Sequence, residues 1–337
     1  MASAIIKAKS PAPGARNSVP LPPNSAPASV RHVRVDEGSA GQRLDNFLLR
    51  ELRGVPKTHV YRIIRSGEVR INKGRADAAS RLAEGDEVRL PPVRLAERET
   101  PAEHAPPREF PIVYEDDHLL VLDKPAGVAV HGGSGVAFGV IEQLRRARPQ
   151  ARLLELVHRL DRDTSGLLMV AKRRSALTAL QDQLRERATH KVYAALVVGA
   201  WPERLKVVDV ALRRYLTATG ERRVAVDAEG QRAISLVRVT QRYAGYSLLA
   251  VTLKTGRTHQ IRVHTASQGH PIVGDDKYGD FALNKRLESR FGRMFLHAEH
   301  LAFDHPADGR RITLHAPLPA ECQAFLTTLE AHAPTPL

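Results

Sequence analysis

Two short amphipathic helices are predicted near the start of the chain, within residues 42–52 and 57–67. Apolar residues recur three or four positions apart in both segments, which places them on one helical face. They are Leu44, Phe47, Leu48 and Leu52 in the first segment and Val60, Ile63 and Ile64 in the second. Gly67 is typical of a residue that ends a helix. Two short strands follow, "EVRIN" and "EVRL", so a compact unit is predicted over residues 31–92.

The pattern changes over residues 111–337, where strand-like runs alternate with helical segments. Buried strands are predicted in "HLLVLDK", "SGLLMVAKRR" and "KVYAALVVG", and a hairpin over residues 232–256. One helix is predicted to begin at Ser175 and another to begin at Thr258 as its N-cap, while "PAECQAFLTTLEAH" is predicted to form a closing helix. This order predicts an α+β fold around a mixed, largely antiparallel sheet.

Two segments are predicted to lie outside these units. Residues 1–30 are rich in Pro, Ala and Ser, and we expect a disordered basic leader; an organelle transit peptide is a less favoured alternative. Residues 93–110 are charged and interrupted by prolines, as is typical of a linker.

The charge of the chain indicates a polyanionic partner. The sequence has 51 Lys and Arg residues against 37 Asp and Glu, a formal net charge of +14, and each phosphate that such residues neutralise releases counterions. Part of the surplus lies on the polar face of the second helix, at Lys57, Arg62 and Arg65, with Arg70 just beyond. A merely solvated basic surface explains the same residues, and composition does not decide between the two interpretations.

The cysteine and hydropathy patterns exclude several classes of protein. Cys322 is the single cysteine, which excludes an internal disulfide framework and a cysteine metal cluster. No run of 18 apolar residues occurs, so no membrane-spanning segment is predicted. We therefore expect a protein of a reducing compartment, the cytoplasm.

The stretch "HRLDRDTSG", residues 158–166, holds five ionisable side chains, those of His158, Arg159, Asp161, Arg162 and Asp163. An acid among arginines stays ionised because nearby cations favour its charged form, and such a group suits nucleophilic attack or charge stabilisation. Two acids at this spacing also suggest a glycosidase pair, and ion pairs that merely order a loop are a structural alternative. The residues alone leave these interpretations open.

Other candidate sites are weaker, and no metal is expected. His259 and His264 fall on different faces of a helix, and no carboxylate completes a ligand set. The acids of "GDDKYG" at 274–279 fit a capped turn better than a magnesium site.

Two family resemblances connect these patterns. Residues 31–92, with "GVPKTHVYRIIRSGEVRIN", resemble the S4 RNA-binding domain, whose helix pair docks on structured RNA. Residues 110–330 resemble the RluA-type pseudouridine synthases, through "HRLDRDTSG", "HKVYAALVVG", "KTGRTHQIRVH" and "GHPIVGDDKYG". The leader before residue 30 is a departure, because the family does not require it.

The resemblance implies isomerisation of uridine to pseudouridine at several sites of large-subunit (23S) ribosomal RNA. It implies no cofactor and no metal, and we expect a monomer. The essential aspartate of the family falls on Asp161, which leaves Asp163 to stabilise the loop. Arg262 would pair with Asp161, and Tyr193 would stack on a base that has left its helix.

The remaining residues are expected to contact RNA. Arg159 would enter the vacated stack or bind a flanking phosphate. Lys124 and the glycine-rich turn at 131–135 would contact backbone phosphates, and Lys57, Arg62, Arg65 and Arg70 would dock the S4-like unit. Two other functions stay open: a non-catalytic ribosomal RNA-binding or assembly protein, and a nucleosidase that releases uracil by means of Asp161 and Asp163.

Overall fold

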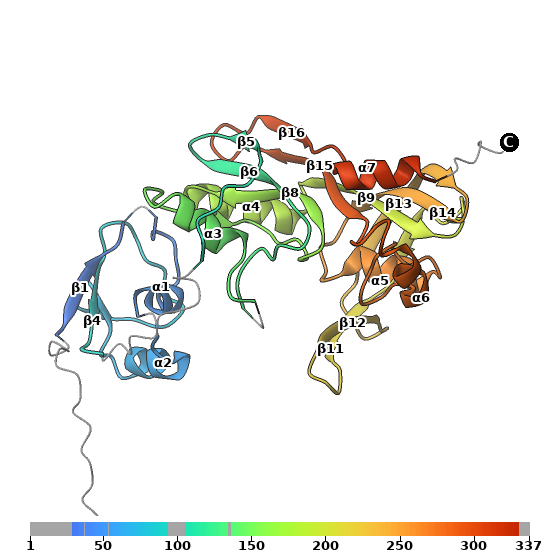
Figure 1. Cartoon of the computed structure of the whole chain (residues 1–337). Coiled ribbons are helices and arrows are strands. Elements are labelled where there is room, and N and C mark those ends of the chain that lie inside the picture. The colour runs from blue at the N-terminus through green and yellow to red at the C-terminus, as the bar shows by residue number, and fades with distance from the viewer. Residues whose placement is uncertain (1–28, 37, 53, 94–104, 134–135, 330–337) are drawn as a thin grey trace, which may run out of the picture.

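The computed structural model describes residues 29–36, 38–52, 54–93, 105–133 and 136–329 of the 337-residue chain (Figure 1). Most of the predicted leader and residues 94–104 of the predicted linker lie outside these ranges. No helix within the described residues is long and apolar enough to cross a membrane.

The N-terminal elements surround a core of their own. They are β1 (Arg31–Arg34), α1 (Leu44–Glu51), α2 (Lys57–Arg65), β2 (Arg70–Ile71), β3 (Gly74–Arg75) and β4 (Glu87–Leu90). The strands form an antiparallel sheet in the order β1-β4-β2-β3. Every apolar position predicted for the two helices is buried in this core, so helical periodicity identified the buried face correctly.

The remaining elements build a larger body, drawn from green to red in Figure 1. Its helices are α3 (Val140–Ala147), α4 (Arg174–Glu186), α5 (Gln260–Ser267), α6 (Phe281–Leu287) and α7 (Ala320–Thr327). Its first strands are β5 (Ile112–Glu115), β6 (Leu119–Lys124), β7 (Glu155–Leu156), β8 (Ser165–Ala171), β9 (His190–Val198) and β10 (Val207–Asp209). The others are β11 (Leu212–Leu216), β12 (Arg222–Val226), β13 (Ile234–Tyr243), β14 (Tyr246–Leu253), β15 (Leu296–Asp304) and β16 (Arg311–His315).

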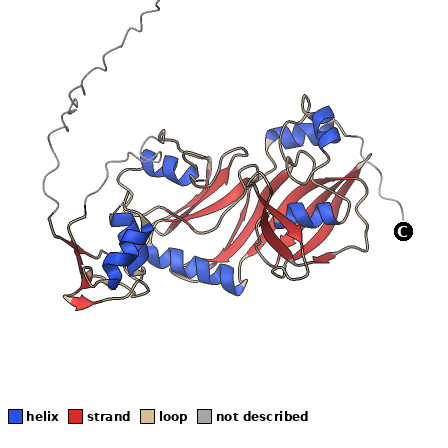
Figure 2. Cartoon of the chain, turned by 90° about the horizontal axis from the view of Figure 1, so that it is seen from below, coloured by secondary structure: helices blue, strands red, loops and turns tan. Residues whose placement is uncertain are grey.

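One sheet of ten strands organises this body. Its main order is β10-β13-β14-β9-β15-β8-β6-β5, with β16 added to β15 and β7 added to β8. Every pairing is antiparallel except β8 with β15, which is parallel. The strands form one long twisted surface in Figure 2, and α4 packs against β8 and β15. The predicted mixed, largely antiparallel sheet is therefore confirmed.

Two helix starts differ from the prediction. α5 begins at Gln260 with His259 as its N-cap, so the assignment of Thr258 as the N-cap is wrong. The Gln260 side chain accepts hydrogen bonds from the Arg257 backbone amide at 3.0 Å and from the Thr255 hydroxyl at 2.8 Å, which ties the start of the helix to the loop before it. α4 begins at Arg174, one residue before the predicted Ser175.

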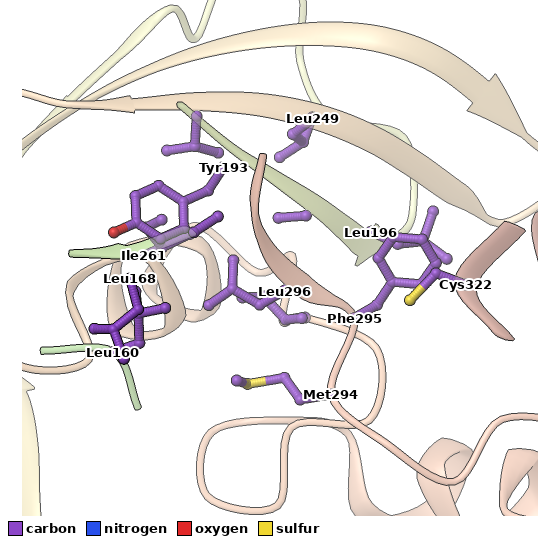
Figure 3. Close-up of a cluster of buried hydrophobic side chains, with 14 of the residues drawn as sticks. Leu160, Leu168, Tyr193, Leu196, Leu249, Ile261, Met294, Phe295, Leu296 and Cys322 are labelled. Atoms are coloured by element: carbon purple, nitrogen blue, oxygen red, sulfur yellow. The ribbon is translucent and has the colours of Figure 1, made fainter. Parts of the chain in front are cut away.

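The centre of the larger body is apolar on both faces of β8 and β9. One buried cluster joins strands β6, β8, β9, β14 and β15 with α3, α5 and α7. Figure 3 shows part of it, with the ring of Tyr193 beside Ile261, Leu160 and Leu168. This cluster fixes the position of the loop that ends at β8, because Leu160 and Leu168 are anchored in the same core.

Gly166 allows β8 to approach β15 closely. Its φ is +107°, and a Cβ atom built there would lie 2.3 Å from the Ala298 carbonyl oxygen. Both the backbone conformation and the missing side chain are therefore required at this position.

Replacing Gly166 with alanine is expected to lower the free energy of unfolding by about 3 kcal/mol or more, because the new methyl group forces the two strands apart. Gly245→Ala is the matched control. Gly245 also has a positive φ, +78°, but a Cβ atom there would have no neighbour within 4 Å, so only about 1–2 kcal/mol is expected. Thermal unfolding followed by circular dichroism measures both, and equal losses would contradict the steric argument.

Candidate active site

A cleft of about 1020 Å³ opens where the loop before β8, the start of β9 and the loop between β14 and α5 meet. Its volume is at the upper end of the range for small-ligand pockets, about 300–1,000 Å³. Among the described residues that line it are seven arginines and two lysines but a single carboxylate, that of Asp161. The cleft is therefore suited to an anionic ligand, with one acid inside it.

Asp161 lies in the loop between β7 and β8. Its backbone carbonyl accepts a hydrogen bond from the Thr164 amide at 3.2 Å, which closes a turn directly before β8. Its carboxylate is 23% exposed, with Oδ2 at 3.5 Å from Nη1 of Arg262 and Oδ1 at 3.9 Å from Nε2 of His259. Asp161 is thus accessible from the cleft and faces two nitrogen donors.

Arg262 is buried, and its main partner is Asp275. Nε and Nη2 of Arg262 each donate a 2.7 Å hydrogen bond to one carboxylate oxygen of Asp275, and Nη2 also contacts Asp276 at 3.1 Å. Burial opposes the charged form of Arg262, but hydrogen bonds to Asp275 and the nearby acids outweigh it and raise the pKa of the guanidinium. The contacts with Asp275 and Asp276 therefore hold the guanidinium of Arg262 in place and keep it charged, independently of its contact with Asp161.

Asp275 is held equally firmly. Its Oδ1 also accepts the backbone amides of Lys277 and Tyr278 at 2.8 and 2.9 Å. Burial raises the pKa of this carboxyl, but the bonds from Arg262 outweigh that effect and the pKa is lowered. The acids of "GDDKYG" thus form a capped turn, as predicted, and the turn supplies the counterion of Arg262.

His259 completes the surroundings of Asp161. It has a left-handed backbone conformation, φ +53°, and its Nδ1 lies 2.8 Å from the Tyr278 hydroxyl. That hydroxyl oxygen also accepts the Val224 amide at 2.9 Å, and Nε2 of the same imidazole ring faces Asp161. Burial lowers the pKa of His259, in keeping with a neutral ring.

Tyr193 forms the apolar wall of the cleft. It lies on β9 with its side chain mostly buried in the central cluster (Figure 3). Burial, together with the charge of Asp161, raises the pKa of its hydroxyl, so it is a neutral phenol at physiological pH. An aromatic side chain that lines the same cleft as the carboxylate suits a planar ligand.

The other ionisable residues of the loop point to different places. Arg159 is exposed at the cleft. Asp163 pairs with the adjacent Arg162 at 3.1 Å, and both line a separate cavity. Asp163 therefore does not share the cleft with Asp161, which contradicts the glycosidase-type pair considered from the sequence.

Lys124 is buried, and its predicted contact with an RNA phosphate is wrong. Its ammonium donates hydrogen bonds to the carbonyl oxygens of Pro125, Val128 and Arg162 at 2.8, 2.8 and 2.9 Å. Burial lowers the pKa of Lys124 to about 7. Because one of its acceptors is in the Asp161 loop, Lys124 ties β6 to that loop.

The other predicted contact residues lie elsewhere. His131 of the glycine-rich turn lines the cleft, while residues 134 and 135 of that turn lie outside the described residues. The four basic residues of the N-terminal unit, Lys57, Arg62, Arg65 and Arg70, are exposed. Of these, Arg62 lies 3.8 Å from Glu68.

Sequence reasoning missed two residues of the cleft region. Asp275 was interpreted only as part of a turn, since nothing in the local sequence shows which arginine it faces. Lys191 precedes Tyr193 by two positions on β9, so it shares that face of the strand, and burial lowers its pKa. The alternation of side chains along a strand places Lys191 on the same face as Tyr193, and this pattern could have identified Lys191 from the sequence.

Comparison with known proteins identifies two family matches. The chain matches the RNA pseudouridylate synthase family over residues 118–267 and the S4 domain family over residues 42–88. The first match includes Asp161, Tyr193 and Arg262, and the second includes α1 and α2.

Similar proteins cover most of the chain. The "Ribosomal large subunit pseudouridine synthase C" of Escherichia coli (strain K12) is 51% identical over 298 residues, which are 86% of this chain and 93% of that protein. The protein of the same name in Haemophilus influenzae is 48% identical, over 90% of this chain and 96% of its own. The solved structure of human RNA pseudouridylate synthase domain containing 1 is 27% identical, with a TM-score of 0.56 over 68% of this chain and 91% of that one.

Asp275→Asn is expected to lower the free energy of unfolding by about 3–5 kcal/mol, because the guanidinium of Arg262 loses its buried counterion. Asp276→Asn is the control. Asp276 also contacts Arg262, but its side chain is 53% exposed, so a loss below about 1 kcal/mol is expected. Urea unfolding measures both variants, and a small effect of Asp275→Asn would show that Asp275 is not the required partner.

Proposed function

The chain belongs to the RNA pseudouridylate synthase family, and we propose that it isomerises uridine to pseudouridine in large-subunit ribosomal RNA, with Asp161 as the catalytic carboxylate. Relatives of about 50% identity over most of the chain are named for this activity on the ribosomal large subunit. Two matched families, one catalytic and one RNA-binding, favour an enzyme over a purely binding protein.

One observation carries the assignment of Asp161. It is the single carboxylate among the described residues that line a cleft rich in arginine and lysine. RNA phosphates fit such a surface. The Arg262 guanidinium, 3.5 Å from the carboxylate of Asp161, orients it toward the bound nucleotide.

The reaction needs little beyond this carboxylate. The N1–C1′ glycosidic bond breaks, the uracil turns while it stays bound, and a C5–C1′ bond forms. The proton of C5 leaves and N1 gains one, so atoms and electrons balance without an oxidant or a second substrate. We propose that Asp161 begins the cleavage, and that no redox cofactor takes part, because the product is an isomer of the substrate and no net oxidation or reduction occurs.

The target uridine must leave its helix to reach Asp161. Tyr193 and Asp161 line the same cleft, and we propose that the aromatic ring of Tyr193 stacks on the uracil. Arg159, exposed in the same loop, would occupy the vacated place or bind a flanking phosphate.

The N-terminal unit would dock the RNA. Lys57, Arg62 and Arg65 project from α2 into solvent and Arg70 lies just beyond, as expected of a phosphate-binding surface. A single chain builds the whole cleft, so we propose that the protein acts as a monomer. Because its proposed substrate is ribosomal RNA, we propose that it acts in the cytoplasm.

Asp161→Asn is expected to abolish tritium release from ribosomal RNA that is labelled at C5 of uridine, because the amide cannot act as the anionic carboxylate. A fall of about 10³-fold or more is expected, while RNA binding measured by filter retention persists. Asp163→Asn, in the same loop but outside the cleft, is the control and should retain most activity.

The same assay separates the competing functions. Isomerisation releases tritium without free base, hydrolysis releases uracil, and a binding protein does neither. Full activity of Asp161→Asn would refute the assignment of Asp161, and free uracil would refute the isomerase.

Reversing charge on α2 is expected to weaken RNA binding. Arg62→Glu with Arg65→Glu removes two phosphate contacts, so affinity should fall and the slope of log affinity against log salt should become shallower by about 1–2. Arg31→Glu with Arg34→Glu, on β1 of the same unit, makes an equal change in net charge and serves as the control. Equal effects of both pairs would show that α2 has no specific role.

A further inference from the structure

Three side chains that are potential metal ligands converge on the surface of strands β15 and β16. The ligand atoms of Glu299, His300 and His315 all lie within 4.8 Å of one another. Nε2 of His300 is 3.5 Å from one carboxylate oxygen of Glu299, and Nε2 of His315 is 3.8 Å from the other. Glu299 thus stands between two imidazoles.

The backbone fixes this arrangement. His300 and His315 are direct partners across the antiparallel pair β15–β16, with ring centroids 4.4 Å apart. Adjacent residues of a strand normally point to opposite faces, which would separate Glu299 from His300. The register of β15 against β9 shifts between Ala298 and His300, and a bulge of this kind redirects a side chain. The irregularity therefore brings Glu299 to the histidines.

The three groups have no better partners among the described residues. Within the described ranges, no hydrogen bond joins any of these side chains to a residue outside the trio, and their ion-pair contacts are with one another. No arginine or lysine neutralises Glu299 in this part of the structure. One carboxylate and two imidazoles facing each other are the donor set that a divalent transition metal accepts.

We propose that Glu299, His300 and His315 form a surface binding site for a divalent transition-metal ion of the zinc class. Ligand atoms around one zinc ion are about 3.3 Å apart, so the side chains must close by roughly an ångström, which rotation about their χ angles allows. Magnesium is not expected to bind, because it prefers oxygen ligands. None of the three residues lines the cleft, so this proposal does not depend on the proposed function.

The test is zinc titration of the full-length, tag-free protein after treatment with a chelator, with a chromophoric zinc indicator as competitor. One equivalent is expected to bind. His300→Gln and His315→Gln should each weaken zinc affinity by at least about 10-fold, because loss of even an outer partner of a metal ligand costs about 10–100-fold. Zinc should also raise the melting temperature of the unchanged protein and not of these variants.

His32→Gln is the matched control. His32 contacts Glu87 at 2.9 Å on the N-terminal sheet, and its side chain is similarly exposed. Among the described residues, however, it belongs to no group of three potential metal ligands. Its zinc affinity should be unchanged. Melting temperatures without zinc show whether each variant folds, which is favoured because the side chains of His300 and His315 are 44% and 51% exposed. Equal zinc affinity of the unchanged protein and of a His300→Gln, His315→Gln double variant would overturn the proposal.

Discussion

A buried guanidinium needs a buried counterion, and the pairing of Arg262 with Asp275 satisfies this requirement at the centre of the site. Two hydrogen bonds of 2.7 Å, from Nε and Nη2, use one edge of the guanidinium and leave Nη1 directed at Asp161. Removal of an ionised arginine from water costs several kcal/mol unless its partner is well placed. The turn after residue 274 therefore supports the candidate active site, although it does not line the cleft.

The other constraints place the Asp161 loop against this arginine. Leu160 anchors the loop in the central cluster, Gly166 lets β8 meet β15, and the Lys124 ammonium binds the carbonyl of Arg162. These contacts come from strands β6, β8 and β15, which are distant in sequence. The carboxylate is held by packing on one side and by charge on the other, which is the preorganisation that electrostatic catalysis requires.

The sequence predicted what depends on local periodicity or on a motif. The apolar faces of α1 and α2, the hairpin β13–β14 and the mixed sheet follow from spacing, and the resemblance directed attention to Asp161, Tyr193 and Arg262. Prediction from the sequence failed where the tertiary fold decides which groups a side chain contacts. Lys124 resembled a surface cation, because nothing nearby shows that three carbonyl groups enclose it. The bulge that turns Glu299 toward His300 could not be predicted from the sequence either, since strand alternation places these two side chains on opposite faces of the sheet.

The presence of one acid, not two, in the cleft bears on the chemistry. A hydrolase of the glycosidase type needs a second carboxyl to activate water, and Asp163 lines a different cavity. The phenol of Tyr193 is neutral at physiological pH and cannot replace a carboxylate base, and Nδ1 of His259 is already engaged with the Tyr278 hydroxyl at 2.8 Å. Among the described residues that line the cleft there is no second acid to direct water at C1′, so the cleft lacks the group on which hydrolysis of this type depends. An apolar wall and a fixed anion thus favour re-formation of a bond to the same base over its release.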